Sequence, residues 1–227
     1  MPTINVPSWL WFVSRRRVLV GFGAALLLVS VFVELSEDVA WSGEEPVLQR
    51  ADRAVLVAVA SVRRPSLTGL ALDVTALGSP PVLAMFTILL GWALARFGRS
   101  RSAAVLVFAA ASGSAWIVFL KRLFARSRPS VVPRLVEVTG LSYPSGHSLV
   151  SAAVYVTAAL LLAARARSVG ERVAIVALGV ALVVAIGTSR VYLGVHYPTD
   201  VLAGLAFGTA WALLLLATSA SVSRLSA

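Results

Sequence analysis

The sequence predicts an all-α membrane protein, a single domain over residues 1–227 in which six helices cross the bilayer. Its composition is the first reason: 59% of the 227 residues are apolar and 13% are charged, with a mean hydropathy of +0.89. Soluble domains average about 45–50% apolar and about 25% charged residues. A soluble domain this apolar would expose large apolar patches and aggregate. The second reason is that the charges fall between long apolar runs, which indicates that the runs face lipid.

The apolar runs approach the length of about 20 residues that a spanning helix needs. In chain order they cover residues 17–35, 79–97, 102–121, 147–165, 172–190 and 200–219. The first run follows three arginines, as the core of a signal peptide does, but its apolar stretch is longer than a usual signal core. We therefore expect an uncleaved first helix.

The connection between the first two runs, residues 35–78, carries too many charges to span a membrane. Within it, residues 54–62 are apolar and are flanked by charged pairs at 52–53 and 63–64. This pattern is typical of a short helix that lies in the membrane interface. A Gly-Ser-Pro-Pro sequence at 78–81 then breaks the chain before the second span.

The formal charge of +10 comes from nineteen arginines and one lysine. These residues lie between apolar runs, which favours membrane topology and anionic membrane lipids over nucleic acid as the explanation. Short connectors at 15–17, 96–101 and 165–172 carry basic clusters and lie on one side if there are six spans. The positive-inside rule then predicts a multi-pass plasma-membrane protein with both termini cytoplasmic.

Three segments on the opposite, extracytoplasmic side carry side chains suited to phosphate chemistry. They are residues 121–129 at the end of the third span, residues 144–147 at the start of the fourth, and residues 189–200 between the fifth and sixth. Both histidines and the only lysine of the chain fall in these segments. The chain has no cysteine, which excludes disulfides, thiolate metal sites and a cysteine nucleophile.

Each segment has a chemical use. Lys121 and Arg128 are seven residues apart and face the same way if their helix continues to Pro129; both side chains bind phosphate oxygens well. Ser145 is a candidate N-cap, and the free amides beyond it favour an anion. His196 and Asp200, four residues apart, are expected on one helix face, where the carboxylate orients the imidazole.

Each segment alone also has an ordinary structural explanation. A single histidine at a helix end is more often structural than catalytic, a basic cluster often binds anionic lipid, and Pro-Ser-Gly often forms a plain turn. On this interpretation Arg122, Arg126 and Arg134 are surface residues, and we assign them no role. Because all the segments are expected at one depth and on one side, the sequence favours a common site.

The order Lys-x6-Arg-Pro, Pro-Ser-Gly-His and Ser-Arg-x5-His-x3-Asp resembles the three-part signature of the type 2 phosphatidic acid phosphatase (PAP2) superfamily. Every position of the signature is matched, and the six-span layout is similar to its membrane branch. The resemblance implies that His196 attacks phosphorus to form a phosphohistidine, that Asp200 orients its ring, and that His147 protonates the leaving oxygen and then activates water. It also implies that the phosphoryl oxygens are held by Lys121, Arg128, Ser145, Gly146 and Arg190.

The implied function is hydrolysis of a lipid phosphate, such as phosphatidate, phosphatidylglycerol phosphate or a polyprenyl diphosphate, without a metal or other cofactor. Three alternatives remain: a phosphotransferase that passes the phosphoryl group to another lipid, a vanadate-dependent haloperoxidase, and a non-catalytic lipid-binding or transport protein. Haloperoxidases of this superfamily are typically soluble, which disfavours the second. Intact motifs disfavour the third.

Overall fold

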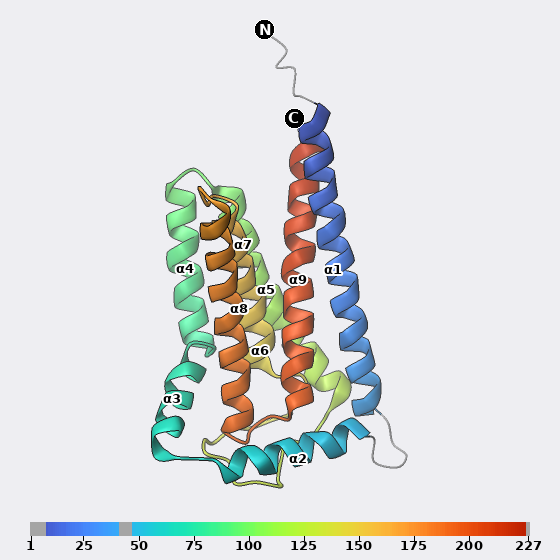
Figure 1. Cartoon of the computed structure of the whole chain (residues 1–227), viewed down its shortest axis with the longest axis vertical. Helices are drawn as coiled ribbons and strands as arrows, with labels where there is room; N and C mark the ends of the chain where they lie inside the picture. The colour runs from blue at the N-terminus through green and yellow to red at the C-terminus, as the bar shows by residue number, and fades with distance from the viewer. Residues whose placement is uncertain (1–7, 41–46, 226–227) are drawn as a thin grey trace.

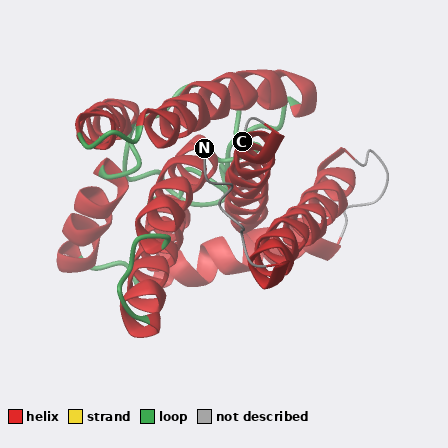
Figure 2. Cartoon of the chain, turned by 90° about the horizontal axis from the view of Figure 1, so that it is seen from above, coloured by secondary structure: helices red, strands yellow, loops and turns green. Residues whose placement is uncertain are grey.

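The computed structural model describes residues 8–40 and 47–225, and every regular element in these ranges is helical (Figures 1 and 2). In chain order the elements are α1 (Ser8–Ala40), α2 (Val47–Ser61), α3 (Pro65–Ala76), α4 (Pro80–Arg96), α5 (Ser100–Phe124), α6 (Gly146–Ser151), the π-helical turn η1 (Ala152–Val156), α7 (Thr157–Ala163), α8 (Val169–Tyr192) and α9 (Pro198–Leu225). The prediction of an all-helical chain is confirmed for this part.

Five helical segments of the described chain are long and apolar enough to cross a membrane. They are Val18–Ala40, Ser100–Phe124, Gly146–Ala163, Val169–Tyr192 and Pro198–Ser219. The pair α3 and α4 passes the same test but is bent by 48° at the break between the two helices. The structure therefore contains five candidate spans, or six if the bent pair is one span, each close to a run that the sequence predicts.

The connection between the first two spans contains more helix than expected. The segment predicted at 54–62 forms the second half of α2 up to Ser61; α2 begins at Val47 and runs across the end of the bundle (Figure 1). The next helix, α3, has no counterpart in the prediction. Pro65 occupies its first turn, where a missing N–H costs nothing. Contacts with α8, rather than a strong local pattern, hold α3 in place.

Close packing between α9 and α6 fixes the start of the fourth span. A Cβ atom built on Gly208 would lie 2.2 Å from the carbonyl oxygen of Leu149, and one on Gly204 would lie 2.8 Å from the carbonyl oxygen of Ser145. Only glycine at these two positions lets the backbones approach this closely. The Pro-Ser-Gly-His segment is thereby pressed against the first turns of α9.

The two ends of the bundle differ. The start of α1 and the end of α9 lie at one end, together with the connections from α4 to α5 and from α7 to α8 (Figure 1). At the other end lie α2, the end of α5, the start of α6 and the connection between α8 and α9. All three predicted motif segments are at this second end.

Candidate active site

Residues far apart in the chain converge at the end of the bundle that carries α2. Lys121 lies in the last turn of α5, His147 in the first turn of α6 and Arg190 in the last turn of α8. His147 interacts electrostatically with both of these cations and with Arg128 and His196. The structure therefore brings the residues of the three motifs together.

His196 and Asp200 form a buried pair, but not on one helix face. The α9 helix begins at Pro198, so His196 lies in the loop before it and Asp200 in its first turn. The expectation that both lie on the helix is wrong, because Pro198 occupies the first turn and leaves His196 outside. The two side chains still meet, with His196 Nδ1 3.2 Å from Asp200 Oδ2. They are 2% and 0% exposed.

The hydrogen bonds of His196 assign its tautomer. Asp200 Oδ2 accepts a hydrogen bond from Nδ1–H, so Nε2 carries the lone pair. Nε2 in turn accepts a hydrogen bond from Arg128 Nη1 at 3.1 Å. Burial lowers the pKa of His196 to about 4; Asp200 raises it, and Arg128 and Lys121 lower it further. At pH 7 the ring is therefore neutral and has the state of a nucleophile.

The helix that carries Lys121 ends earlier than the prediction requires. It stops at Phe124, and Ala125 takes a left-handed conformation with φ of 48°. Lys121 and Arg128 therefore do not share a helix face. The turn instead brings Arg128 back toward the loop at 139–142, which both side chains contact.

Backbone carbonyls hold these two cations in place. Lys121 Nζ donates to the carbonyls of Leu141 and Ser142. Arg128 donates from Nε to Gly140 at 3.0 Å and from Nη1 to Val195 at 2.9 Å. These contacts orient the cations without neutralising them.

Arg190 is also oriented by a neutral partner. It is 4% exposed and donates from Nη1 to Thr75 Oγ1 of α3 at 2.8 Å, while its buried Nε has no partner. Within residues 8–40 and 47–225, no carboxylate lies within ion-pair distance of Arg190, Lys121 or Arg128. Arg190 is buried and the other two cations are partly buried, and cations without a carboxylate partner favour the binding of an anion.

Ser145 is the N-cap of α6, as the sequence predicts. Its Oγ accepts hydrogen bonds from the amide of Ser148 at 3.4 Å and from Ser148 Oγ at 3.1 Å. Its own amide donates to the main-chain carbonyl of Asp200 at 2.9 Å, which ties α6 to α9. Gly146, the next residue, lines the cavity described below. A Cβ atom there would lie 3.3 Å from Ile117 Cγ1.

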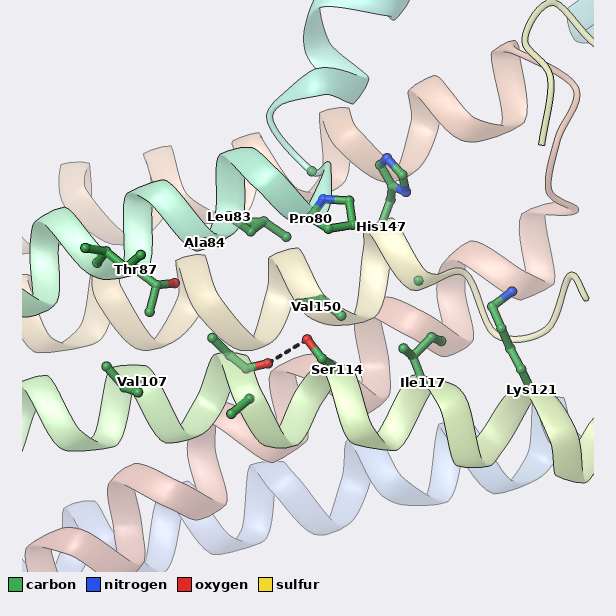
Figure 3. Close-up of a pocket in the computed structure, with 15 residues that line it drawn as sticks. Pro80, Leu83, Ala84, Thr87, Val107, Ser114, Ile117, Lys121, His147 and Val150 are labelled. Carbon is green, nitrogen blue, oxygen red and sulfur yellow. Dashed lines mark hydrogen bonds between the residues drawn. The ribbon is translucent and has the colours of Figure 1, made fainter. Parts of the chain in front are cut away.

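A cavity of about 560 Å³ leads from these residues between α4 and α5 (Figure 3). Lys121, Gly146 and His147 line one end, and the rest is lined by Gly78, Val150 of α6 and small or apolar side chains of α4 and α5. Its lining on α5 reaches Val107, fourteen residues before Lys121, which is about 21 Å along the helix axis. The site thus opens into a long apolar groove.

Two residues that lie at the site were not predicted from the sequence to belong to it. Arg126, interpreted there as a surface residue, has a side chain only 11% exposed and lies between Asp200 and Asp52. Asp52, interpreted as a flank of the interfacial segment, is 2% exposed. The two are 74 residues apart in the chain, so no local spacing could reveal their contact.

Comparison with known proteins identifies the family. The family model described as the PAP2 superfamily matches residues 102–223, more than half of the chain. This chain belongs to the PAP2 superfamily. The resemblance inferred from the motifs is confirmed.

Two proteins named as phosphatases resemble it over most of its length. It is 31% identical over 163 residues to phosphatidylglycerophosphatase B of Bacillus subtilis (strain 168), which covers 71% of this chain and 79% of the relative. It is 37% identical over 164 residues to decaprenylphosphoryl-5-phosphoribose phosphatase of Mycobacterium tuberculosis, covering 70% and 85%.

The crystal structure of a transmembrane PAP2 type phosphatidylglycerolphosphate phosphatase from Bacillus subtilis superposes with a TM-score of 0.81 at 26% identity. The match covers 88% of this chain and 98% of the solved one. With the apolar helices, these similarities show that the chain is a multi-pass membrane protein and an enzyme that hydrolyses phosphate esters.

Proposed function

We propose that this PAP2 protein removes the phosphate group from a membrane lipid through a phosphohistidine at His196. One observation carries the proposal. A neutral imidazole, oriented by Asp200, presents Nε2 beside cations that have no carboxylate partner in the described chain. Phosphoryl transfer needs positioning and neutralisation of charge more than covalent assistance, and this arrangement supplies both.

In the first step the phosphate oxygens bind to Lys121, Arg128 and Arg190. Arg128 binds the anion in place of His196 Nε2. The freed lone pair of Nε2 then attacks phosphorus. The bond from nitrogen to phosphorus forms as the bond from phosphorus to the lipid oxygen breaks, and His147 gives that oxygen a proton. The charge of the phosphate favours the protonated form of His147. Asp200 stabilises the positive ring of phosphohistidine.

In the second step His147, now neutral, takes a proton from water. The water oxygen attacks phosphorus, the bond to His196 Nε2 breaks, and inorganic phosphate leaves with the lone pair restored to the imidazole. Ser145 and the Gly146 amide lie where the start of α6 meets the site, and we assign them contacts with phosphoryl oxygens. Three side-chain cations do the work that magnesium does in kinases, so no metal or other cofactor is required.

The groove between α4 and α5 supports a lipid substrate. Its lining is apolar, it begins at Lys121 and His147, and it runs about 21 Å along a helix. A hydrocarbon tail in this groove leaves the phosphate at the cations. The two relatives are named for a phosphatidylglycerol phosphate and a decaprenyl lipid. We therefore propose phosphatidylglycerol phosphate, phosphatidate or a polyprenyl phosphate or diphosphate as the substrate.

We further propose six spans, with α3 and α4 as one bent span and α2 in the membrane interface. The basic connectors at 96–101 and 165–172 lie at the same end as the start of α1 and the end of α9 (Figure 1). Short basic loops stay in the cytoplasm. This supports cytoplasmic termini and a site at the extracytoplasmic face of the plasma membrane.

The test is release of inorganic phosphate by the purified protein in detergent, across a panel of these lipids and with or without a chelator. His196→Ala is expected to lower turnover by at least about 10³-fold, because the nucleophile is lost. Turnover unchanged in that variant would rule out the mechanism. Phosphate release that requires an added acceptor lipid favours a phosphotransferase, and activity that disappears with chelator contradicts the metal-free proposal.

A further inference from the structure

Arg126 bridges two buried carboxylates beside the proposed nucleophile. It donates from Nη1 to Asp200 Oδ1 at 2.7 Å and from Nη2 to Asp52 Oδ2 at 2.8 Å. Its guanidinium carbon lies 4.1 Å from the centre of the Tyr197 ring, next to His196 in the chain. Burial opposes its charge, but Asp200 and Asp52 more than offset this and raise the pKa of Arg126. Arg126 therefore stays positively charged in this bridge.

The bridge leaves Asp200 one orientation. Arg126 is the donor to Oδ1, whereas Oδ2 receives hydrogen bonds from His196 Nδ1, from the Tyr197 amide at 2.9 Å and from Ser142 Oγ. Rotation of the carboxylate would break contacts at both oxygens. Because charge-assisted hydrogen bonds are about twice as strong as neutral ones, Arg126 is the main restraint on Oδ1.

Asp52 holds this bridge from α2. Its Oδ1 accepts a hydrogen bond from the Thr199 amide at 2.9 Å, and its Oδ2 accepts from Thr199 Oγ1 as well as from Arg126. Thr199 and Asp200 are neighbours in the first turn of α9. A residue of α2 thus fixes both the start of α9 and the guanidinium that contacts the carboxylate.

Asp200 favours a positive imidazole, whereas burial, Arg128 and Lys121 keep the free ring neutral. With a neutral His196 ring, Asp52, Asp200 and Arg126 leave one negative charge in a buried environment. When Nε2 bonds to phosphorus the ring becomes positive and the cluster becomes neutral. An uncompensated charge in a buried environment is unfavourable, and an opposite charge nearby offsets that cost. The cluster is thus electrostatically matched to the intermediate.

We propose that Arg126, held by Asp52, is a positioning residue that keeps Asp200 aimed at His196 Nδ1, while the two carboxylates balance the positive charges of Arg126 and the phosphorylated ring. The proposal rests on the proposed function, since it assigns a support to that site. It gives α2 a catalytic purpose that its place at the end of the bundle would not suggest.

The experiment compares Arg126→Gln, Arg126→Lys, Asp52→Asn and the double variant with wild type. Arg126→Gln is expected to lower kcat by about 10- to 100-fold, as loss of an orienting partner usually does, with KM changed less than about twofold. Lysine restores the charge but lacks the planar fork that reaches Asp200 and Asp52 from separate nitrogens, so it should recover only part of kcat. Arg122→Gln, an exposed arginine of α5, is the matched control and should keep wild-type kcat.

Coupling between the Arg126 and Asp52 substitutions distinguishes an effect on positioning of Asp200 from a general loss of stability. If Asp52 acts through Arg126, the double variant should have about the kcat of Arg126→Gln, whereas independent effects would multiply. Single-turnover measurement should show slower formation of the phosphoenzyme, and the thermal midpoint reports folding. Either multiplying losses, or a folded Arg126→Gln with kcat within twofold of wild type, would overturn the proposal.

If Arg126→Gln does not fold, Asp52→Asn decides. This variant keeps an oxygen for the Thr199 amide but loses the charge and the oxygen that accepts from Arg126, so it should fold and lose kcat rather than KM. A wild-type kcat in folded Asp52→Asn rejects the proposal. Failure of the proposed function is distinct: wild type would then release no phosphate, or His196→Ala would be as active as wild type, before these variants are compared.

Discussion

At the scale of single residues, His196 is surrounded by one carboxylate and several cations. Burial lowers the pKa of His196 more than Asp200 raises it, so the folded pKa of about 4 lies below the ordinary value of 6.5. The unfolded chain therefore binds this proton before the native protein does. As pH falls from about 6.5 toward 4, the fold should lose stability, and below the folded pKa the nucleophile itself should be protonated.

This titration can be measured on one ring. The chain contains two histidines, so in untagged His147→Gln protein the only imidazole is His196. With ¹⁵N-labelled histidine, the ring resonances should titrate with a midpoint near pH 4 and show the Nδ1–H tautomer above it. A midpoint above pH 7 contradicts the neutral state assigned to the nucleophile.

The sequence predicted the residues with distinctive spacing and missed those without it. The two histidines, Lys121, Asp200 and the N-cap Ser145 stand in short patterns whose chemistry can be read locally. Arg126 stands among other arginines, and its partner Asp52 is 74 residues away. Only the folded arrangement of α2 against the start of α9 distinguishes a bridging arginine from a lipid-facing one.

At the scale of elements, the groove separates binding of the tail from chemistry at the phosphate. Ala111 of α5 lines the cavity away from the motif residues. Ala111→Trp should fill the groove and lower kcat/KM for a long-chain lipid phosphate by more than about tenfold, because two displaced methylenes already amount to about 1.6 kcal/mol. Hydrolysis of a water-soluble phosphate ester without a tail should change less than about twofold.

Val118→Trp provides the matched control for this measurement. Val118 lies on the same helix and is 50% exposed, but does not line the cavity. Its replacement should leave both substrates unaffected. Equal losses on the lipid and on the soluble ester in Ala111→Trp would show that the tail does not lie in this groove.

Element boundaries show where prediction from the sequence stops. The runs near the five candidate spans were predicted because length and hydropathy alone determine them. Three features depend on tertiary contacts instead: the α3 helix, the end of α5 at Phe124, and the π-helical turn at Ala152–Val156. The end of α5 acts on the site directly, since it turns Arg128 toward His196. The π-helical turn follows the helix that carries His147.

At the scale of the whole molecule, the proposed orientation has both chain ends on one side of the membrane and the site on the other. The chain has no cysteine, so single cysteines report sidedness without background. Glu137→Cys, near the site, should react with a membrane-impermeant maleimide in intact cells. Arg167→Cys, between α7 and α8, should react only after permeabilisation. Both positions are exposed, and the reverse labelling pattern would contradict the orientation.

The convergence of three distant segments matters only if it creates a nucleophile, so the most direct test is detection of the covalent intermediate. His147→Ala protein is mixed with a phosphate ester that has a good leaving group, quenched in alkali and analysed by mass spectrometry. With a good leaving group, formation of the phosphohistidine needs no proton donor. Its hydrolysis lacks the general base His147, so a phosphoryl group should accumulate on His196. Phosphate released with no phosphoryl group on His196, or with one on another residue, would contradict the account.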